Sequence, residues 1–327
     1  MQNQKNTIEG ISVIITVHDR KNFITKAVKS VLDQTIDKRF YEIIVIKNFT
    51  DKEIDSFLQE HGVRTALIRE NPVILKHYLG IEMAKFEVIA FLDDDDTFHP
   101  QKLDRLFEVF SRIEGCDFYH NNRFYESEKY ANFEVNRIND VVVFDNEQPD
   151  KCAFKRLLSQ DPNYNLSSMA LTKRLARKSK VLIENITREA DPMWFLCALE
   201  FGSKIIADPL ELTGYTRHSG GVSRSNDSLK VTKYANEALE SYNSHFAGFH
   251  SPYAKRYLDY SILEWNIRKS VMNPNRTRKD MAVFLKQLLI QNKEVSPVKW
   301  KLVQVLIAII FIFLPVASRQ LYPHIYR

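Results

Sequence analysis

Four consecutive aspartates, Asp93–Asp96, are the strongest chemical feature of the sequence. They directly follow an apolar run that ends in Phe91 and Leu92, which predicts that they lie at the end of a buried strand. Adjacent carboxylates repel one another, and a divalent cation relieves that repulsion. Their hard oxygen atoms suit Mg²⁺ or Mn²⁺, which can bridge diphosphate oxygens. The alternative is a solvated loop in which one aspartate, or Thr97, caps a following helix.

Alternating strand and helix patterns surround the aspartate run. The predicted strands are short, apolar and β-branched: Ile11–Thr16, Tyr41–Ile46, Thr65–Ile68 and Glu87–Leu92. Between them, apolar residues recur at helical spacing over Ala27–Leu32, Asp51–His61 and Val73–Ala84, and Pro100 is expected to open a further helix. This order predicts βαβ units and a mostly parallel sheet, in which ligands bind at the carboxyl ends of the strands.

The pattern changes after residue 116. Residues 117–143 are irregular and aromatic, which indicates antiparallel strands and loops. Further on, the sequence predicts helices over Cys152–Leu158, Leu171–Lys178 and Asp191–Phe201, a short strand over Lys204–Asp208 and a polar loop over Ser219–Ser228. From Leu229 to Ile290 the pattern is helical, with breaks near Phe249–Pro252 and Asn273–Arg276.

Four separate blocks carry a family resemblance. The stretches ISVIITVHDR, AVKSVLDQT, EIIVI and VIAFLDDDDTFHPQKL, in this order and spacing, resemble the family 2 glycosyltransferases of the GT-A fold. The resemblance covers residues 9–225 and is strongest over 11–112. It implies an α/β fold, a Rossmann-like, mostly parallel sheet that binds a nucleotide-diphospho-sugar. The implied GT-A catalytic domain is 1–225, with a nucleotide-binding half (1–112) and an acceptor-side half (113–225), followed by a helical extension (226–298).

The resemblance also implies roles for residues on the donor side. Thr16 and His18 match the turn after the first strand, which contacts the nucleoside. Asn48 matches the aspartate that reads the base, but Lys47-Asn48-Phe49-Thr50 replaces the usual Asp-Asp-Gly-Ser. An amide offers both a donor and an acceptor to a base edge. Asp93, Asp94 and Asp95 match the DxD motif, with Asp95 and Asp93 as metal ligands and Asp93 and Asp94 toward the ribose or donor sugar.

Further matches lie downstream. READPMWFLCALEFG resembles the block of the catalytic base, which places Asp191 at the base and Ala190 where the family has glutamate. The alternative role of Asp191 is to cap the helix that begins at Pro192. YTRHSGGVS resembles the closing block, which implies that Arg217 and His218 approach the diphosphate or the metal. Lys76 and His77 match weakly a basic position near the phosphates.

The C-terminal segment, 299–327, has a different character. Residues 251–327 hold 13 Lys and Arg against 4 Asp and Glu, whereas residues 1–250 hold 33 against 37. Leu302–Ser318, inside the segment 299–327, is the strongest apolar run of the sequence. It is flanked by Lys299, Trp300 and Arg319. Its length of 17 residues is at the lower limit for a membrane span, and such flanks are typical of the membrane interface. A spanning helix, an interfacial or re-entrant helix, and a buried or dimer-forming helix remain open, so a homo-oligomer is an option.

The rest of the composition bounds the location and the partners. Met1–Gly10 lacks the apolar stretch of a signal peptide, which predicts a cytoplasmic protein attached to the cytoplasmic face of the membrane. The three cysteines have no common short spacing, which predicts reduced thiols rather than disulfides or a CxxC-type metal site. No nucleic-acid-binding module is recognisable, and the GxGxxG, GxxxxGK[ST], GxSxG and HExxH motifs are absent from the sequence.

Three functional hypotheses follow. The first is a metal-dependent, inverting glycosyltransferase that moves a sugar from a nucleotide-diphospho-sugar to an acceptor hydroxyl or phosphate, on a glycan or a lipid-linked acceptor. The second is a catalytically silent GT-A-like partner subunit that binds a nucleotide or a glycan, motivated by the departures at Lys47, Asn48 and Ala190. The third is a nucleotidyltransferase, which we rank low because the loop after Thr16 contains no glycine.

Overall fold

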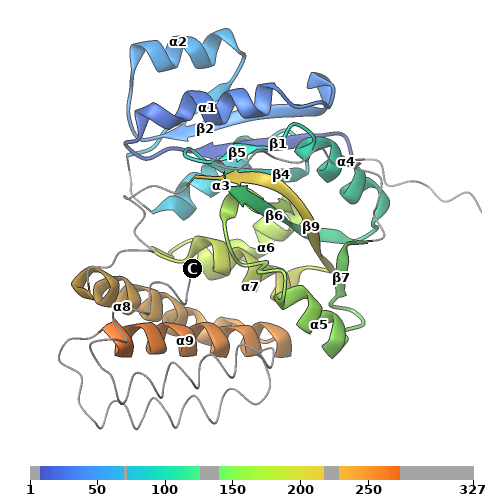
Figure 1. Ribbon diagram of the computed structural model, residues 1–327, viewed down its shortest axis with the longest axis vertical. Coiled ribbons are helices and arrows are strands. Elements are labelled where there is room, and N and C mark those ends of the chain that lie inside the picture. The colour runs from blue at the N-terminus through green and yellow to red at the C-terminus, as the bar shows by residue number, and fades with distance from the viewer. Residues whose placement is uncertain (1–7, 70–71, 126–139, 217–227, 273–327) are drawn as a thin grey trace, which may run out of the picture. The chain divides into compact units, whose positions relative to one another are not determined.

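The computed structural model describes residues 8–69, 72–125, 140–216 and 228–272. The chain divides into two compact units, Met1–Arg217 and His218–Arg327. The first unit is a mixed sheet with helices on both faces (Figure 1). This arrangement confirms the predicted α/β class.

One half of the sheet is parallel. The four strands of this half are β3 (Arg64–Leu67), β2 (Tyr41–Lys47), β1 (Ile11–Thr16) and β4 (Val88–Asp93), in this spatial order. Every residue of β1 is buried, as expected of a β-branched strand covered on both faces. In the register of the sheet, Thr16 pairs with Ile46 on one side and with Asp93 on the other. The carboxyl ends of β1, β2 and β4 therefore meet at one edge of the sheet.

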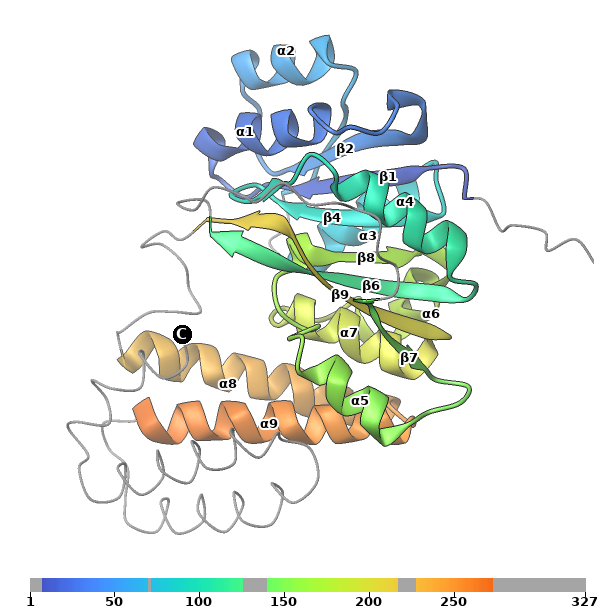
Figure 2. The ribbon, with the colours of Figure 1, turned by 45° about the vertical axis from the view of Figure 1, so that its right-hand side comes forward.

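The other half is mixed. Its strands are β8 (Met169–Thr172), β6 (Cys116–Tyr125), β9 (Lys204–Tyr215), β5 (Thr97–Phe98) and β7 (Val142–Asp145). They continue the order as β4-β8-β6-β9-β5, with β7 against β9. β8 is antiparallel to both β4 and β6, so β6 runs in the same direction as β4. β9 is parallel to β6 and therefore also runs in that direction. Figure 2 shows β6 and β9 side by side. Their carboxyl ends reach the same edge as Asp93.

Three elements differ from the prediction. Leu171 belongs to β8 and not to a helix, because four residues paired with distant strands leave no local periodicity to read. The strand predicted over Lys204–Asp208 continues to Tyr215, since β6 pairs with its whole length. Pro100 is not the first helical residue: its carbonyl accepts from the Thr35 N–H at 2.9 Å, and the helix begins at Lys102.

The helices cover the two faces of the sheet. On one face, apolar residues of α1 (Lys21–Leu32), α2 (Lys52–Glu60) and α4 (Lys102–Arg112) form one core with Val13 and Ile15. On the other face lie α3 (Val73–Met83), α6 (Lys173–Ile183) and α7 (Ala190–Phe201). There the buried Trp194 stacks on Phe91 of β4 with ring centroids 5.7 Å apart. A further helix, α5 (Lys151–Leu158), packs beside β7.

The second unit contains a pair of helices, α8 (Ser228–His245) and α9 (Pro252–Met272). Tyr234 of α8 and Trp265 of α9 contact each other, with ring centroids 5.3 Å apart. This confirms the predicted helices, and their break, as far as Met272. Among the residues that the structure describes, no helix combines the length and apolarity that crossing a membrane requires. The apolar run Leu302–Ser318 lies outside those residues.

Candidate functional site

The aspartate run begins at the last residue of β4 and lies at the edge where the parallel strands end. The Thr16 hydroxyl is 3.5 Å from a carboxylate oxygen of Asp93. The His18 N–H donates to Asp94 at 3.4 Å. These contacts place Thr16, His18, Asp93 and Asp94 together, as the sequence analysis expected.

Arg20 is the counter-ion of the run, and sequence reasoning missed it. Its guanidinium pairs with a carboxylate oxygen of Asp94 and with one of Asp95. The Asp94 side chain is fully buried, whereas Asp95 and Arg20 are partly exposed. Burial raises the pKa of Asp94 to about 6, and the Arg20 charge opposes that rise. No sequence signal marked Arg20, because its approach depends on a turn at Asp19, which has a φ of +56°.

The oxygen atoms of this run fit a hard divalent cation. Asp94 and Asp95 already converge on one cationic group, and Mg²⁺ is commonly held by one or two carboxylates together with substrate phosphates. No cluster of three or more ligating side chains suitable for a metal is found in residues 8–69, 72–125, 140–216 and 228–272.

A single turn of 3₁₀ helix, η3 (Leu166–Ser168), supports the run from the neighbouring strands. The Asp93 N–H donates to the Ser167 hydroxyl at 3.0 Å. Burial raises the pKa of Asp96 to about 7, while hydrogen bonds from Ser167 and from the Thr216 N–H, at 3.1 Å, favour its charged form. Sequence reasoning missed this turn, because nothing in the local pattern shows that it meets residues 70 positions earlier.

Asp191 is the second residue of α7 and does not cap that helix, since Glu189 occupies the cap position. One Asp191 carboxylate oxygen accepts the Leu166 N–H at 3.1 Å. Burial, with the nearby Glu189 charge, raises the pKa of Asp191 to about 7. Burial and then the charge of Asp191 raise the pKa of Asp93, so the two carboxyls lie close enough to interact. The fold therefore brings Asp191 to the aspartate run.

The nucleoside side is built from the turns after β1 and β2. The side-chain oxygen Oδ1 of Asn48 accepts a hydrogen bond from the Asp19 N–H at 3.0 Å, and its side-chain nitrogen Nδ2 donates to the Asp19 carboxylate at 2.9 Å. The amide nitrogen also lies 3.2 Å from Nδ1 of His18. Asn48 thus fixes the His18–Asp19 turn at the carboxyl end of β1.

The two weakly matched basic residues of α3 have different environments. Lys76 is buried, donates to the Val17 carbonyl at 2.9 Å and lies 3.2 Å from Nδ1 of His18. It therefore belongs to the site. His77 is buried on the other side, where Trp194 donates to its Nδ1 at 3.2 Å, and it belongs to the core. Arg217 and His218 lie outside the described residues, so their placement stays a prediction.

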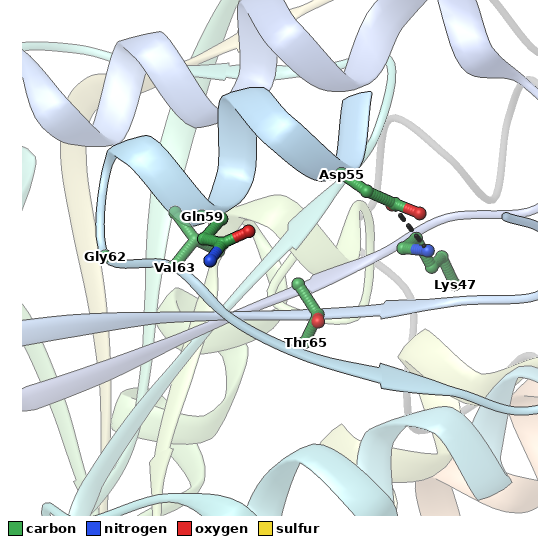
Figure 3. Close-up of a pocket in the computed structure, with 6 residues that line it drawn as sticks. All are labelled: Lys47, Asp55, Gln59, Gly62, Val63 and Thr65. Carbon is green, nitrogen blue, oxygen red and sulfur yellow. Dashed lines mark ion pairs between the residues drawn. The ribbon is translucent and has the colours of Figure 1, made fainter. Parts of the chain in front are cut away.

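A pocket of about 490 Å³ opens behind Lys47, between α2 and the outer strands (Figure 3). The residues that line it are Lys47, Asp55, Gln59, Gly62, Val63 and Thr65. The Lys47 ammonium is 2.8 Å from a carboxylate oxygen of Asp55 and 2.8 Å from the Phe49 carbonyl. The lysine that replaces the first acid of the usual motif is thus held within the protein by Asp55 and the Phe49 carbonyl.

Comparisons with known proteins agree with this geometry. Residues 12–174 match the family model described as glycosyl transferase family 2. An uncharacterized glycosyltransferase of Rickettsia bellii is 33% identical over 99 residues, 29% of this chain. The poly(ribitol-phosphate) β-N-acetylglucosaminyltransferase TarP of Staphylococcus aureus is 27% identical over 106 residues, 31% of this chain. These matches span only 14% of the Rickettsia protein and 32% of TarP.

Solved structures share the fold at low sequence identity. The crystal structure of Staphylococcus aureus TarS 1–349 superposes with a TM-score of 0.54 at 13% identity, covering 88% of this chain and 81% of that one. GalNAc-T7 with UDP, GalNAc and Mn²⁺ has a TM-score of 0.55 at 16% identity, covering 93% of this chain and 58% of that one. The fold is thus that of the GT-A glycosyltransferases.

Proposed function

The chain belongs to glycosyltransferase family 2, and on that premise we propose that it transfers a sugar from a nucleotide-diphospho-sugar to an acceptor. The observation that carries the proposal is the approach of the half-buried Asp191 to the aspartate run at the carboxyl edge of the sheet. Fold neighbours in complex with UDP-GlcNAc, and with GDP-Man and Mn²⁺, support a nucleotide-sugar donor. TarP, a sequence relative, acts on poly(ribitol-phosphate) by its name, which supports a glycan or polyol acceptor.

Asp191 is the proposed general base. It takes the proton of the acceptor hydroxyl as that oxygen forms a bond to C1 of the donor sugar. The bond between C1 and the diphosphate oxygen breaks in the same step, and its electron pair leaves with the nucleoside diphosphate. A single displacement of this kind inverts the configuration at C1. A carboxylate with a pKa of about 7 suits the task, because general bases work best with a pKa near the working pH.

Two cations of the chain face the leaving group in this proposal. Arg20, on Asp94 and Asp95, and the buried Lys76 both lie beside the turn after β1. Positive groups held in a partly desolvated site stabilise the charge that develops on a departing diphosphate. Asp95 together with Asp93 or Asp94 would hold Mn²⁺ or Mg²⁺, and such a cation, when bound, would neutralise diphosphate charge.

Asn48 is the proposed contact for the nucleoside base. The oxygen and the nitrogen of its side-chain amide are both hydrogen-bonded to Asp19. A base that contacts Asn48 therefore also contacts the His18–Asp19 turn. We infer that this turn, rather than one side chain, sets the preference for the base. Thr16 and His18 complete this surface from the β1 side.

We also propose attachment to the cytoplasmic face of a membrane through the C-terminal segment. The supporting observation is the apolar run Leu302–Ser318 between basic and aromatic flanks in a segment rich in Lys and Arg. A surface-bound enzyme would meet a lipid-linked acceptor directly.

A second candidate function is a nucleotide-binding partner subunit without catalysis. It is favoured by Ala190 in place of a glutamate and by the engagement of Asn48 with Asp19. Such a protein would bind a nucleoside diphosphate but would neither transfer nor hydrolyse a donor sugar.

A thermal-shift panel tests the proposal. ADP, CDP, GDP, UDP and dTDP are added with and without Mn²⁺, because a ligand that binds only the folded state raises the unfolding midpoint. A Mn²⁺-dependent rise with one diphosphate, lost in Asp95→Ala, is the expected result. Release of that diphosphate from its sugar conjugates then separates the enzyme from the silent subunit. The absence of any shift across the panel would contradict a donor site at the aspartate run.

A further inference from the structure

Three tyrosines and one arginine gather at the carboxyl ends of β6 and β9. Tyr125 and Tyr215 are paired in the sheet, and their ring centroids are 6.2 Å apart at 68°. Tyr164, before η3, meets Tyr215 at 6.0 Å and 61°. The Arg123 guanidinium carbon lies 4.0 Å from the centre of the Tyr164 ring. All four side chains are partly exposed, and together they are called the tyrosine platform below.

Main-chain N–H groups next to two of the tyrosines connect the platform to the aspartate run and to Asp191. Thr216, next to Tyr215, donates its N–H to Asp96 at 3.1 Å. Leu166, two residues after Tyr164, donates its N–H to Asp191 at 3.1 Å. A ligand that rests on the platform therefore lies beside Asp191, on the opposite side of the aspartate run from the β1 and β2 turns.

The charge of Arg123 is not neutralised within this part of the molecule. Among the residues that the structure describes, no carboxylate forms an ion pair with its guanidinium. The guanidinium carbon lies over the Tyr164 ring, and this cation–π contact uses none of the five N–H groups, which form a rigid fork. That fork matches the oxygen atoms of a phosphate or a carboxylate. By contrast, Arg20, on the donor side, is engaged by Asp94 and Asp95.

We propose that the tyrosine platform and Arg123 form the acceptor subsite, and that the acceptor is a sugar or polyol unit carrying a phosphate or carboxylate group. This inference rests on the proposed function. The C–H faces of a sugar or polyol pack on aromatic rings, and tyrosine hydroxyls add polar contacts. The aspartate run and Asp191 repel an anionic acceptor, so its binding there requires a cation, and Arg123 is the cation at the platform.

The test measures dissociation constants by ligand-observed NMR on the full chain. Its probes are ribitol 5-phosphate and D-glucuronic acid, with ribitol and D-glucose as neutral counterparts. Each titration contains Mg²⁺, which is diamagnetic and so does not broaden the ligand signals, and the nucleoside diphosphate that raises the midpoint most. A charge-assisted contact corresponds to about 10- to 100-fold in affinity. Arg123→Met should therefore weaken both anionic probes about 10- to 100-fold and leave the neutral probes unchanged, while Arg123→Lys should retain part of the affinity.

A matched control removes an equivalent pair elsewhere. Arg39 lies 4.9 Å from the Phe40 ring, in the turn that precedes the first residue of β2 and so at the opposite end of the strand. Arg39→Met should change none of the four dissociation constants. Tyr164→Leu should weaken the anionic and neutral probes alike, because it removes the ring on which both kinds of unit pack.

The outcomes separate the two proposals. A normal nucleotide-induced shift in Arg123→Met shows that its donor site is folded. With that shift present, equal binding of charged and neutral probes, no binding of any probe, or unchanged affinity in Arg123→Met would each overturn the anionic acceptor subsite alone. A wild-type chain without any nucleotide shift would overturn the proposed function, and the acceptor role of the platform with it.

Discussion

Replacing Asp191 by asparagine tests the base directly, because the change removes a proton acceptor and little else. The asparagine carbonyl can still accept the Leu166 N–H, which now donates to Asp191 at 3.1 Å. General-base catalysis contributes about 10²- to 10⁴-fold to a rate. We therefore expect Asp191→Asn to lower kcat by about 10²- to 10⁴-fold, which corresponds to about 3–5 kcal/mol in the barrier.

The pKa of Asp191 adds a second signature. Only the ionised carboxyl can accept a proton, so wild-type kcat/KM should fall as the pH drops below about 7 and should level off above it. That acidic limb should disappear in Asp191→Asn. Since the folded-state pKa lies above the unfolded value, the carboxyl lowers stability as the pH rises through about 7. The asparagine variant should then be no less stable than the wild type at pH 8.

The assay follows release of the nucleoside diphosphate from its sugar conjugate, with the thermal midpoint and the nucleotide-induced shift measured on the same samples. Asp150→Asn is the matched control, because Asp150 caps α5 by accepting the Ala153 N–H at 2.7 Å and asparagine caps equally well. Its turnover should be unchanged. If Asp191→Asn kept turnover within about threefold of wild type, or kept the acidic limb, the assignment of the base would be refuted.

Three further perturbations follow from the packing and the charges of the first unit. Arg20→Met removes the guanidinium that pairs with the buried Asp94 and the partly exposed Asp95, so the midpoint without metal should fall, and Mn²⁺ should raise it more than in wild type; equal Mn²⁺ shifts would contradict this. Asp208→Ala removes the buried counter-ion of Arg105, whose Nε lies 2.7 Å from it, and leaves the buried guanidinium with Glu108, at 3.1 Å; this should cost about 3–5 kcal/mol in urea unfolding, and a loss below about 1 kcal/mol would contradict a buried pair. Gly80→Ala places a Cβ 2.6 Å from Ile14 and should destabilise by about 1–3 kcal/mol, whereas an unchanged urea midpoint would show that the core yields there.

The parallel half of the fold could be predicted almost to the residue. A strand buried on both faces must be apolar along its whole length, so β1 and β4 stand out from the amphipathic helices between them. The aspartates after β4 could be placed for the same reason, because parallel strands bring their carboxyl ends to one edge. These conclusions need only local patterns and one rule of topology.

The other half could not be predicted in the same way, because its elements are defined by distant partners. β8 has four residues and pairs with strands about 50 and 80 positions earlier, and no period can develop over that length. Arg20 meets two aspartates 74 and 75 positions away because of a left-handed turn at Asp19. Tyr125 and Tyr215 come together only through the parallel pairing of β6 with β9.

The η3 turn explains why the donor and acceptor sides cannot be treated as independent sites. Ser167 accepts the N–H of Asp93 and bonds Asp96, while the preceding Leu166 N–H holds Asp191 and Tyr164 carries the platform. The stretch from Tyr164 to Ser167 thus touches the proposed metal ligands, the proposed base and the proposed acceptor surface. A shift of the turn would move all three together. For this reason a substitution at Ser167 should raise KM for the donor and lower kcat at once, whereas Arg123→Met should act on the acceptor alone.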